Sequence, residues 1–178
     1  MTCIVGLVEN GTIYMGGDSA GTNGDLEFSI RLDPKVFLLK NRFIVGFTSS
    51  FRMGQLLRFS LKPPNQKRGE DDYEYMCTAF IDAVRLCFHA GGYMGKEKDG
   101  GDREEGGVFL VGYRGVLYYV GNDFQVGINQ NPYYSVGSGK NAALGSLFTT
   151  DPLGLDPEKR ITLALEAATH FSAGVKPP

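Results

Sequence analysis

The 178-residue chain has no tryptophan, only two histidines and only three cysteines. An odd number of cysteines argues against a disulfide framework and is typical of a reducing compartment. The spacing of Cys77, Cys87 and His89 fits no zinc-binding pattern. We therefore expect these three residues to be ordinary core or surface residues of a helix.

Excess charge and long apolar runs are also missing. The net charge is −2, so there is no basic surplus to attract nucleic acid. The apolar runs have the length of strands and are too short to span a bilayer. No basic segment precedes the first of them, as a signal peptide would require. These features predict a cytoplasmic protein that binds neither nucleic acid nor a membrane.

What the chain does have is a regular alternation of strand and helix patterns within an ordinary globular composition. Turn residues such as Asn10-Gly11, Asn41-Arg42 and Arg114-Gly115 join neighbouring strands. The predicted strands are residues 2–8, 12–17, 35–40, 43–48, 107–113, 115–121 and about 133–137. The first predicted helix begins after Ser49 or Ser50 as its N-cap. Two further helices span about 72–90 and 139–148, and the last begins after Asp156 as its N-cap.

The order of these elements predicts the fold class. The first strand is apolar on both faces, so we expect it to be covered on both sides. Residues 18–25, "DSAGTNGD", are predicted to form a loop. With no repeat and no linker, residues 1–178 are predicted to form one α+β domain, in which two sheets lie face to face with helices outside.

Two stretches resemble known sites but lack residues that those sites need. The "GSGK" at 137–140 is not a phosphate loop, because Tyr134 and Asn141 stand where glycine and Ser or Thr are required. Residues 91–107 are rich in glycine and charge, and we expect a mobile surface loop. Such a loop cannot hold a fixed pair of carboxylates, and the order of its acidic residues does not match a calcium loop. Its acidic residues are Asp99, Asp102, Glu104 and Glu105.

Thr2, Asp18 and Lys35 form the candidate site with the most specific chemistry. A threonine hydroxyl is a poor nucleophile without a base, and a free α-amino group with a pKa of about 7.7–8.0 supplies one on the same residue. Removal of Met1 would expose that amine. A nearby lysine would lower the pKa of the hydroxyl and the amine, and a carboxylate would orient the lysine. The three residues are expected to meet at one end of a sheet, although each is also consistent with an ordinary surface position.

Four stretches, in their order and spacing, resemble the proteasome β-type peptidases and especially the HslV-type bacterial peptidase, which are N-terminal nucleophile hydrolases. The stretches are "TCIVGLVENGTIYMGGDSAG", "KVFLLKNRFIVGFTSS", "VFLVGYRGVLYYVGNDFQV" and "YYSVGSGKNAALGSL". The resemblance implies a four-layer αββα sandwich of two antiparallel sheets flanked by helices. It also implies a threonine-type endopeptidase that uses Thr2 after removal of Met1 and needs no cofactor.

The same resemblance assigns roles to individual residues. Thr2 falls on the nucleophile, Asp18 on the acid that holds the lysine, and Lys35 on the active-site lysine. Ser49 stands where the family has a glycine whose N–H binds the oxyanion, and its side chain is expected to narrow the site. The remaining assignments are Ser138 near the N-terminal amine, Ser172 as a distal serine with Thr169 in place of the usual aspartate, and Gly21, Phe47 and Phe51 at the first specificity pocket, although both phenylalanines could equally be core.

Partners follow from the family resemblance as well. Family members enclose their sites in rings, often fed by an ATPase, so we expect a homo-oligomeric ring, polypeptide substrates and a possible ATPase unfoldase. The apolar helix stretch "AALGSLF" at 142–148 fits burial in such a ring. Relatives run on into one more strand at the C-terminal end. Two alternatives remain, a small-molecule amidase on the same fold and a catalytically inactive shell subunit.

Overall fold

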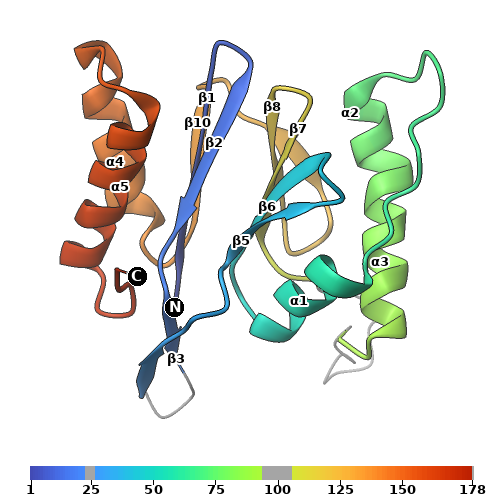
Figure 1. The fold of residues 1–178 in the computed structure, drawn as a ribbon, viewed down its shortest axis with the longest axis horizontal. Coiled ribbons are helices and arrows are strands. Elements are labelled where there is room, and N and C mark those ends of the chain that lie inside the picture. The colour runs from blue at the N-terminus through green and yellow to red at the C-terminus, as the bar shows by residue number, and fades with distance from the viewer. Residues whose placement is uncertain (23–26, 94–105, 178) are drawn as a thin grey trace.

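Two antiparallel sheets pack face to face at the centre of the computed structural model, which describes residues 1–22, 27–93 and 106–177 (Figure 1). The first sheet has the order β10-β1-β2, with strands β10 (Tyr133–Gly137), β1 (Cys3–Glu9) and β2 (Thr12–Gly17). The second has the order β5-β6-β7-β8-β9, with strands β5 (Val36–Leu39), β6 (Phe43–Phe47), β7 (Phe109–Tyr113), β8 (Val116–Val120) and β9 (Val126–Ile128). A separate ribbon pairs β3 (Ala20–Thr22) with β4 (Phe28–Ile30).

Helices cover the outer face of each sheet (Figure 1). The first sheet is covered by α4 (Lys140–Thr150) and α5 (Pro157–Phe171), which the short turn η3 (Asp151–Leu153) connects. The second is covered by α1 (Phe51–Gln55), η1 (Leu56–Ser60), α2 (Asp72–Tyr75), η2 (Met76–Phe80) and α3 (Ile81–Ala90). The predicted α+β class with its four αββα layers is therefore confirmed.

Strand β1 lies inside the sandwich and is apolar on both faces, as its sequence predicted. Cys3, Val5 and Leu7 face the helices α4 and α5 in one core cluster. Ile4 points the other way, into a small cluster between the two sheets. Because side chains alternate along a strand, the neighbour of Cys3 on the other face is Thr2, at the edge of the space between the sheets.

Most of the predicted elements are observed, with small corrections at the turns. The turn after β1 has the expected positive φ at Asn10 and Gly11. The turn between β5 and β6 is shifted, because positive φ occurs at Lys40 and Asn41 rather than at Asn41-Arg42. The Arg42 N–H donates to the carbonyl of Leu39 and closes a three-residue loop, so β5 ends one residue earlier than predicted.

Other corrections concern short elements. The predicted loop 18–25 contains strand β3, and β9 was not predicted at all. Ser50 rather than Ser49 caps α1, since its hydroxyl accepts from the Arg52 N–H. The predicted mobile loop 91–107, including its acidic cluster, lies largely outside the described residues, as does part of the stretch 18–25. Among the described residues, no helix has the length and apolar character needed to cross a membrane.

Candidate active site

Thr2 lies just before β1, at the end of the first sheet where β10 finishes. Strand pairing sets Cys3 opposite Gly137, and the Thr2 N–H donates to the hydroxyl of Ser138 over 3.1 Å. Gly137 has a φ of 99°, and a Cβ there would lie 2.2 Å from the Thr2 carbonyl oxygen. Glycine is therefore needed at this position for β10 to approach Thr2 so closely.

Lys35 and Asp18 complete a buried cluster around the Thr2 hydroxyl. The Lys35 ammonium donates to Thr2 Oγ1 over 3.0 Å and to Asp18 Oδ1 over 2.7 Å. The side chains of Lys35 and Asp18 are each only 1% exposed, and Thr2 is buried as well. Four of the predicted site residues thus come together from the ends of four different strands: Thr2, Asp18, Lys35 and Ser138.

The Asp18 carboxylate is held by more than the lysine. Its Oδ1 also accepts from the Cys3 N–H at 2.9 Å, and its Oδ2 accepts from the Ala20 N–H at 3.0 Å. The Asp18 N–H in turn donates to the Cys3 carbonyl. A buried carboxylate with three donors is well compensated for its lost hydration. Asp18 is therefore a fixed anchor for Lys35.

The position of Lys35 follows from its place just before β5. Its carbonyl accepts from the Phe47 N–H at 3.1 Å, which ties this end of β5 to β6. Burial lowers the pKa of Lys35 below its ordinary value, while the hydrogen bond and the charge of Asp18 oppose that shift. An ammonium of lowered pKa beside a hydroxyl can stabilise negative charge on the oxygen when that oxygen loses its proton.

Met1 is packed against the same site. The Thr2 hydroxyl donates to the Met1 carbonyl at 2.7 Å, and the Met1 amine donates to Thr22 Oγ1 at 2.7 Å. The Met1 side chain lies against Gly174, where a Cβ would be 2.2 Å from the Cβ of Met1. With Met1 attached, the nitrogen of Thr2 is an amide and cannot act as a base.

Ser49 lies in the turn between β6 and α1 with a φ of 66°, in the left-handed region. The methyl of Thr48 would be 3.3 Å from a Cβ on Gly137, so the turn lies near the Thr2 end of the first sheet. Among the described residues, no acceptor is found for the Ser49 N–H. The Ser49 hydroxyl accepts from the Val108 N–H at 3.1 Å, and the expected narrowing of the site by this side chain stays a prediction.

The predicted pocket residues lie in two different environments. Phe47 is buried in the core under the helices, edge to face with Phe51 at 5.7 Å. Phe51 is half-buried, with the Arg31 guanidinium 4.2 Å from its ring centre and the Lys35 ammonium 5.7 Å from it. A Cβ on Gly21 would lie 3.1 Å from the Arg31 side chain. Phe51 and Gly21 therefore share Arg31 as a neighbour beside Lys35, whereas Phe47 is a core residue.

Ser172 is not in hydrogen-bond contact with this cluster. It ends α5, where its N–H donates to the Ala168 carbonyl and its own carbonyl accepts from the Val175 N–H. Within the described part of the chain, no hydrogen bond joins its side chain to Thr2, Lys35 or Asp18. Its predicted role as a distal site residue stays a prediction.

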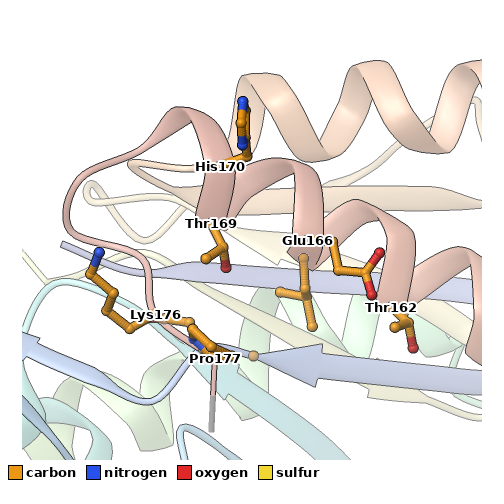
Figure 2. Close-up of a pocket in the computed structure, with 9 residues that line it drawn as sticks. Thr162, Glu166, Thr169, His170, Lys176 and Pro177 are labelled. Atoms are coloured by element: carbon orange, nitrogen blue, oxygen red, sulfur yellow. The ribbon is translucent and has the colours of Figure 1, made fainter.

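A cavity of about 500 Å³, which was not predicted, lies on the α5 side of Asp18. Thr162, Glu166 and Thr169 extend from one face of α5, while the ring of His170 points away from them (Figure 2). Its lining includes Asp18 but neither Thr2 nor Lys35. No pattern of residue types marks such a space, because it arises where α5, the end of β2 and the C-terminal segment meet.

No group of three or more His, Cys, Asp or Glu side chains that could hold a metal ion occurs in the described ranges. The nearest thiol to the site is Cys3, whose side chain lies on the helix-facing side of β1 against Ser135. Burial raises the pKa of the Cys3 thiol to about 11, so it stays protonated at neutral pH. The chemistry available at this end of the sheet is therefore that of the Thr2 hydroxyl, the Lys35 ammonium and backbone N–H groups.

Solved structures with this arrangement of layers are found among proteasome-like proteins. Thiobacillus denitrificans BPH, whose structure was also solved in complex with epoxomicin, has a TM-score of 0.77 at 19% identity, covering 99% of this chain and 94% of that chain. HslV from Trypanosoma brucei has a TM-score of 0.68 at 17% identity, with 98% and 94% covered. Anbu (ancestral beta-subunit) from Yersinia bercovieri has a TM-score of 0.63 at 13% identity, with 99% and 78% covered.

These likenesses establish the fold. The chain has the four-layer α+β sandwich fold of BPH, HslV and Anbu. No protein-family model and no curated protein sequence matches the chain.

Proposed function

We propose that the chain is a threonine-type endopeptidase of the proteasome and HslV kind, in which Thr2 is the nucleophile after removal of Met1. One observation carries the proposal. The Lys35 ammonium lies 3.0 Å from Thr2 Oγ1 and 2.7 Å from Asp18 Oδ1, and all three residues are buried. An ion pair that only stabilises the fold has no need to contact a threonine hydroxyl. A buried ammonium that does contact one can activate that hydroxyl as a nucleophile. The fold shared with HslV and BPH supports the same conclusion.

The reaction follows from the atoms at the site. Thr2 Oγ attacks the carbonyl carbon of a peptide bond and passes its proton to the Thr2 amine, directly or through a water molecule. The Lys35 ammonium stabilises Thr2 Oγ as this oxygen loses its proton. The Ser49 N–H donates a hydrogen bond to the negatively charged carbonyl oxygen of the intermediate. The tetrahedral intermediate collapses, the peptide C–N bond breaks, and the leaving amine takes the proton from the Thr2 amine. Water then attacks the ester carbonyl and gives a proton to the Thr2 amine. The bond between that carbon and Thr2 Oγ breaks, and Oγ takes the proton back from the amine, which frees the acid product.

The other predicted site residues have supporting roles in this proposal. The Ser138 hydroxyl accepts from the Thr2 nitrogen at 3.1 Å, so it would orient the free amine once Met1 is gone. Ser172 would contribute through water at a greater distance. Gly21 and Phe51, with the buried Phe47 behind them, would form the first specificity pocket, and the Arg31 guanidinium lies over one side of it.

The test joins a mass measurement with turnover of peptides. Intact mass shows whether Met1 is removed, and fluorogenic peptides with apolar, acidic and basic residues before the cleaved bond report hydrolysis. We expect trimmed wild type to cleave at least one of these peptides, Thr2→Ala to be inactive and Thr2→Ser to keep part of the activity. We also expect epoxomicin, with which BPH was solved in complex, to inhibit the wild type.

A matched control is Thr149→Ala, because Thr149 is an exposed threonine on α4 whose hydroxyl bonds only to helix carbonyls. It should keep full activity. The proposal is wrong if trimmed wild type cleaves no peptide, or if Thr2→Ala cleaves as fast as wild type. Retention of Met1 with no turnover would favour an inactive shell subunit. Hydrolysis of small amides but of no peptide would favour an amidase.

Assembly into a homo-oligomeric ring is part of the proposal, with polypeptide substrates, a possible ATPase unfoldase as partner and a cytoplasmic location. The support is the exposure of two large apolar side chains that follow each other in the chain, Phe148 on α4 at 69% and Leu153 in η3 at 62%. Burial of such side chains in a subunit interface would remove apolar surface from water. Sizing of the native particle tests the ring, and Phe148→Asp should shift the particle toward monomers. A monomeric wild type would contradict ring assembly but would leave the proposed hydrolase mechanism unaffected.

A further inference from the structure

The turn from Thr48 to Ser50 has a strained shape that its side chains hold in place. Ser49 has a φ of 66°, a conformation that costs a residue with a side chain more than it costs glycine. The Ser50 N–H donates to the Thr48 carbonyl at 2.7 Å and closes a tight turn. Strain of this kind persists only where the surroundings fix the backbone, so the contacts of the turn matter.

Three hydrogen bonds join Thr48 and Ser49 to Val108, which lies just before β7. The Val108 carbonyl accepts from the Thr48 N–H at 3.0 Å and from the Thr48 hydroxyl at 2.8 Å. The Val108 N–H donates to the Ser49 hydroxyl at 3.1 Å. The two hydroxyls, Thr48 Oγ1 and Ser49 Oγ, are 3.3 Å apart. The turn is therefore fixed to β7 by backbone and side chains together.

Gly107 makes this approach possible. A Cβ on Gly107 would lie 3.2 Å from the Cβ of Ser49 and 2.2 Å from the sulfur of Met53. The Ser49 side chain thus packs flat against the chain before β7, and its hydroxyl reaches the Val108 N–H. Within the described part of the chain, no acceptor is found for the Ser49 N–H.

We propose that the Ser49 hydroxyl is a positioning group for the oxyanion donor, so that the side chain bonded to Val108 holds the Ser49 N–H in a fixed orientation. This inference rests on the proposed function. A glycine at position 49 would reach the same backbone shape without strain, but it would leave the Val108 N–H without its acceptor. The turn would then be held to Val108 by Thr48 alone. An oxyanion donor works best when it does not have to reorient during the reaction. In this chain the hydrogen bond between the Val108 N–H and the Ser49 hydroxyl would hold the Ser49 N–H in place.

The test compares substitutions at Ser49 in the trimmed, full-length protein. Ser49→Ala removes the acceptor for Val108, and we expect kcat to fall about 10-fold while KM changes less than 2-fold, since a mobile donor stabilises the transition state less. The kcat of Ser49→Gly should fall by at least as much as that of Ser49→Ala. Ser49→Asn should recover most of kcat, because asparagine tolerates positive φ and its side-chain oxygen can accept from the Val108 N–H.

Ser50→Ala is the control, since Ser50 is the adjacent serine and its hydroxyl caps α1 instead of bonding to Val108. It should leave kcat unchanged. Hydrogen exchange of the Val108 amide gives a readout that needs no activity, and it should be faster in Ser49→Ala than in wild type or Ser50→Ala.

The outcomes separate the two proposals. An unchanged kcat in Ser49→Ala, with Thr2→Ala inactive, would overturn the positioning role and leave the peptidase proposal standing. Unchanged exchange at Val108 in Ser49→Ala would overturn it as well. If Thr2→Ala were fully active, the proposed function itself would fail, whatever the exchange at Val108.

Discussion

Lys35 and Asp18 form an ion pair of 2.7 Å whose two side chains are each 1% exposed. The same chain carries a second pair of the same length at the surface, between Arg31 and Asp33, with side chains 38% and 41% exposed. A buried pair costs much when one member is removed, because the other charge is left without compensation, whereas an exposed pair contributes little. The two pairs therefore offer a matched comparison.

Asp18→Asn is expected to lower the free energy of unfolding by about 3–5 kcal/mol, because the Lys35 ammonium would be left buried beside a neutral amide. Asp33→Asn should cost no more than about 1 kcal/mol. Urea unfolding of both variants measures the difference. In the double variant Asp18→Asn/Lys35→Met the loss should be smaller than in Asp18→Asn alone, since no charge remains. Equal losses in Asp18→Asn and Asp33→Asn would contradict this account.

The pH dependence of turnover should have two limbs if Thr2 and Lys35 act as proposed. At the acid side, kcat/KM rises as the Thr2 amine loses its proton, near about 7.7–8.0 for an ordinary α-amine. At the alkaline side it falls as Lys35 loses its proton. Because burial lowers the pKa of Lys35 from its ordinary 10.5, the fall should begin at a lower pH than for a free lysine.

Lys35→Arg provides the control for the alkaline limb, because arginine stays charged throughout this range. Whatever activity that variant keeps should no longer fall at high pH. The measurement is kcat/KM from pH 5 to pH 11 for both proteins. If kcat/KM falls at the same alkaline pH in wild type and in Lys35→Arg, Lys35 is not the group that titrates.

The sequence predicted the layers of the fold well because the long strands and helices carry strong periodic patterns. β1 illustrates this, since its apolar residues on both faces correctly indicated a strand covered on two sides. β3, β4 and β9 are three residues each, too short for an alternation to be recognised. Their pairing comes from tertiary contacts, which no local pattern encodes.

The site was less predictable from local patterns than the fold. Thr2, Asp18 and Lys35 are each also consistent with an ordinary surface position, so their residue types alone did not select them. The order and spacing of the four stretches that resemble the peptidase family did. Ser172 shows the limit, since its place at the end of α5 depends on how the helix docks. The bond between Ser49 and Val108 joins residues 59 positions apart and could not be inferred from either one.

Cys3 should make the stability of the protein fall at alkaline pH. Burial raises the pKa of its thiol from 9.0 to about 11, so the folded state keeps the proton that the unfolded state loses. The contribution to stability is complete below pH 9 and is lost as the pH rises toward 11. Between pH 8 and pH 10.5 this loss amounts to about 2 kcal/mol, since each pKa unit corresponds to about 1.4 kcal/mol.

The measurement is the free energy of unfolding in urea at pH 8 and at pH 10.5, for wild type and Cys3→Ala. Other groups titrate in the same range, but they do so in both proteins, so the difference isolates the thiol. Cys3→Ala should lose about 2 kcal/mol less than wild type over this interval. Parallel losses in the two proteins would show that the Cys3 thiol is not held protonated by the fold. Cys87→Ala is a fitting comparison, because its thiol is only partly buried.

Arg160 should contribute more to stability than any exposed arginine. It lies on α5, is only 5% exposed, and bonds through Nη2 to the Leu147 carbonyl at the end of α4 and to Asp151 at 2.6 Å. Arg160→Ala removes these bonds and leaves a cavity between the helices, so we expect a loss of about 2–4 kcal/mol in the free energy of unfolding. Arg160→Met keeps most of the volume and should lose less. Arg85→Ala, at an exposed position, should change stability by no more than about 0.5 kcal/mol, and a similar loss in all three variants would contradict a specific role for Arg160.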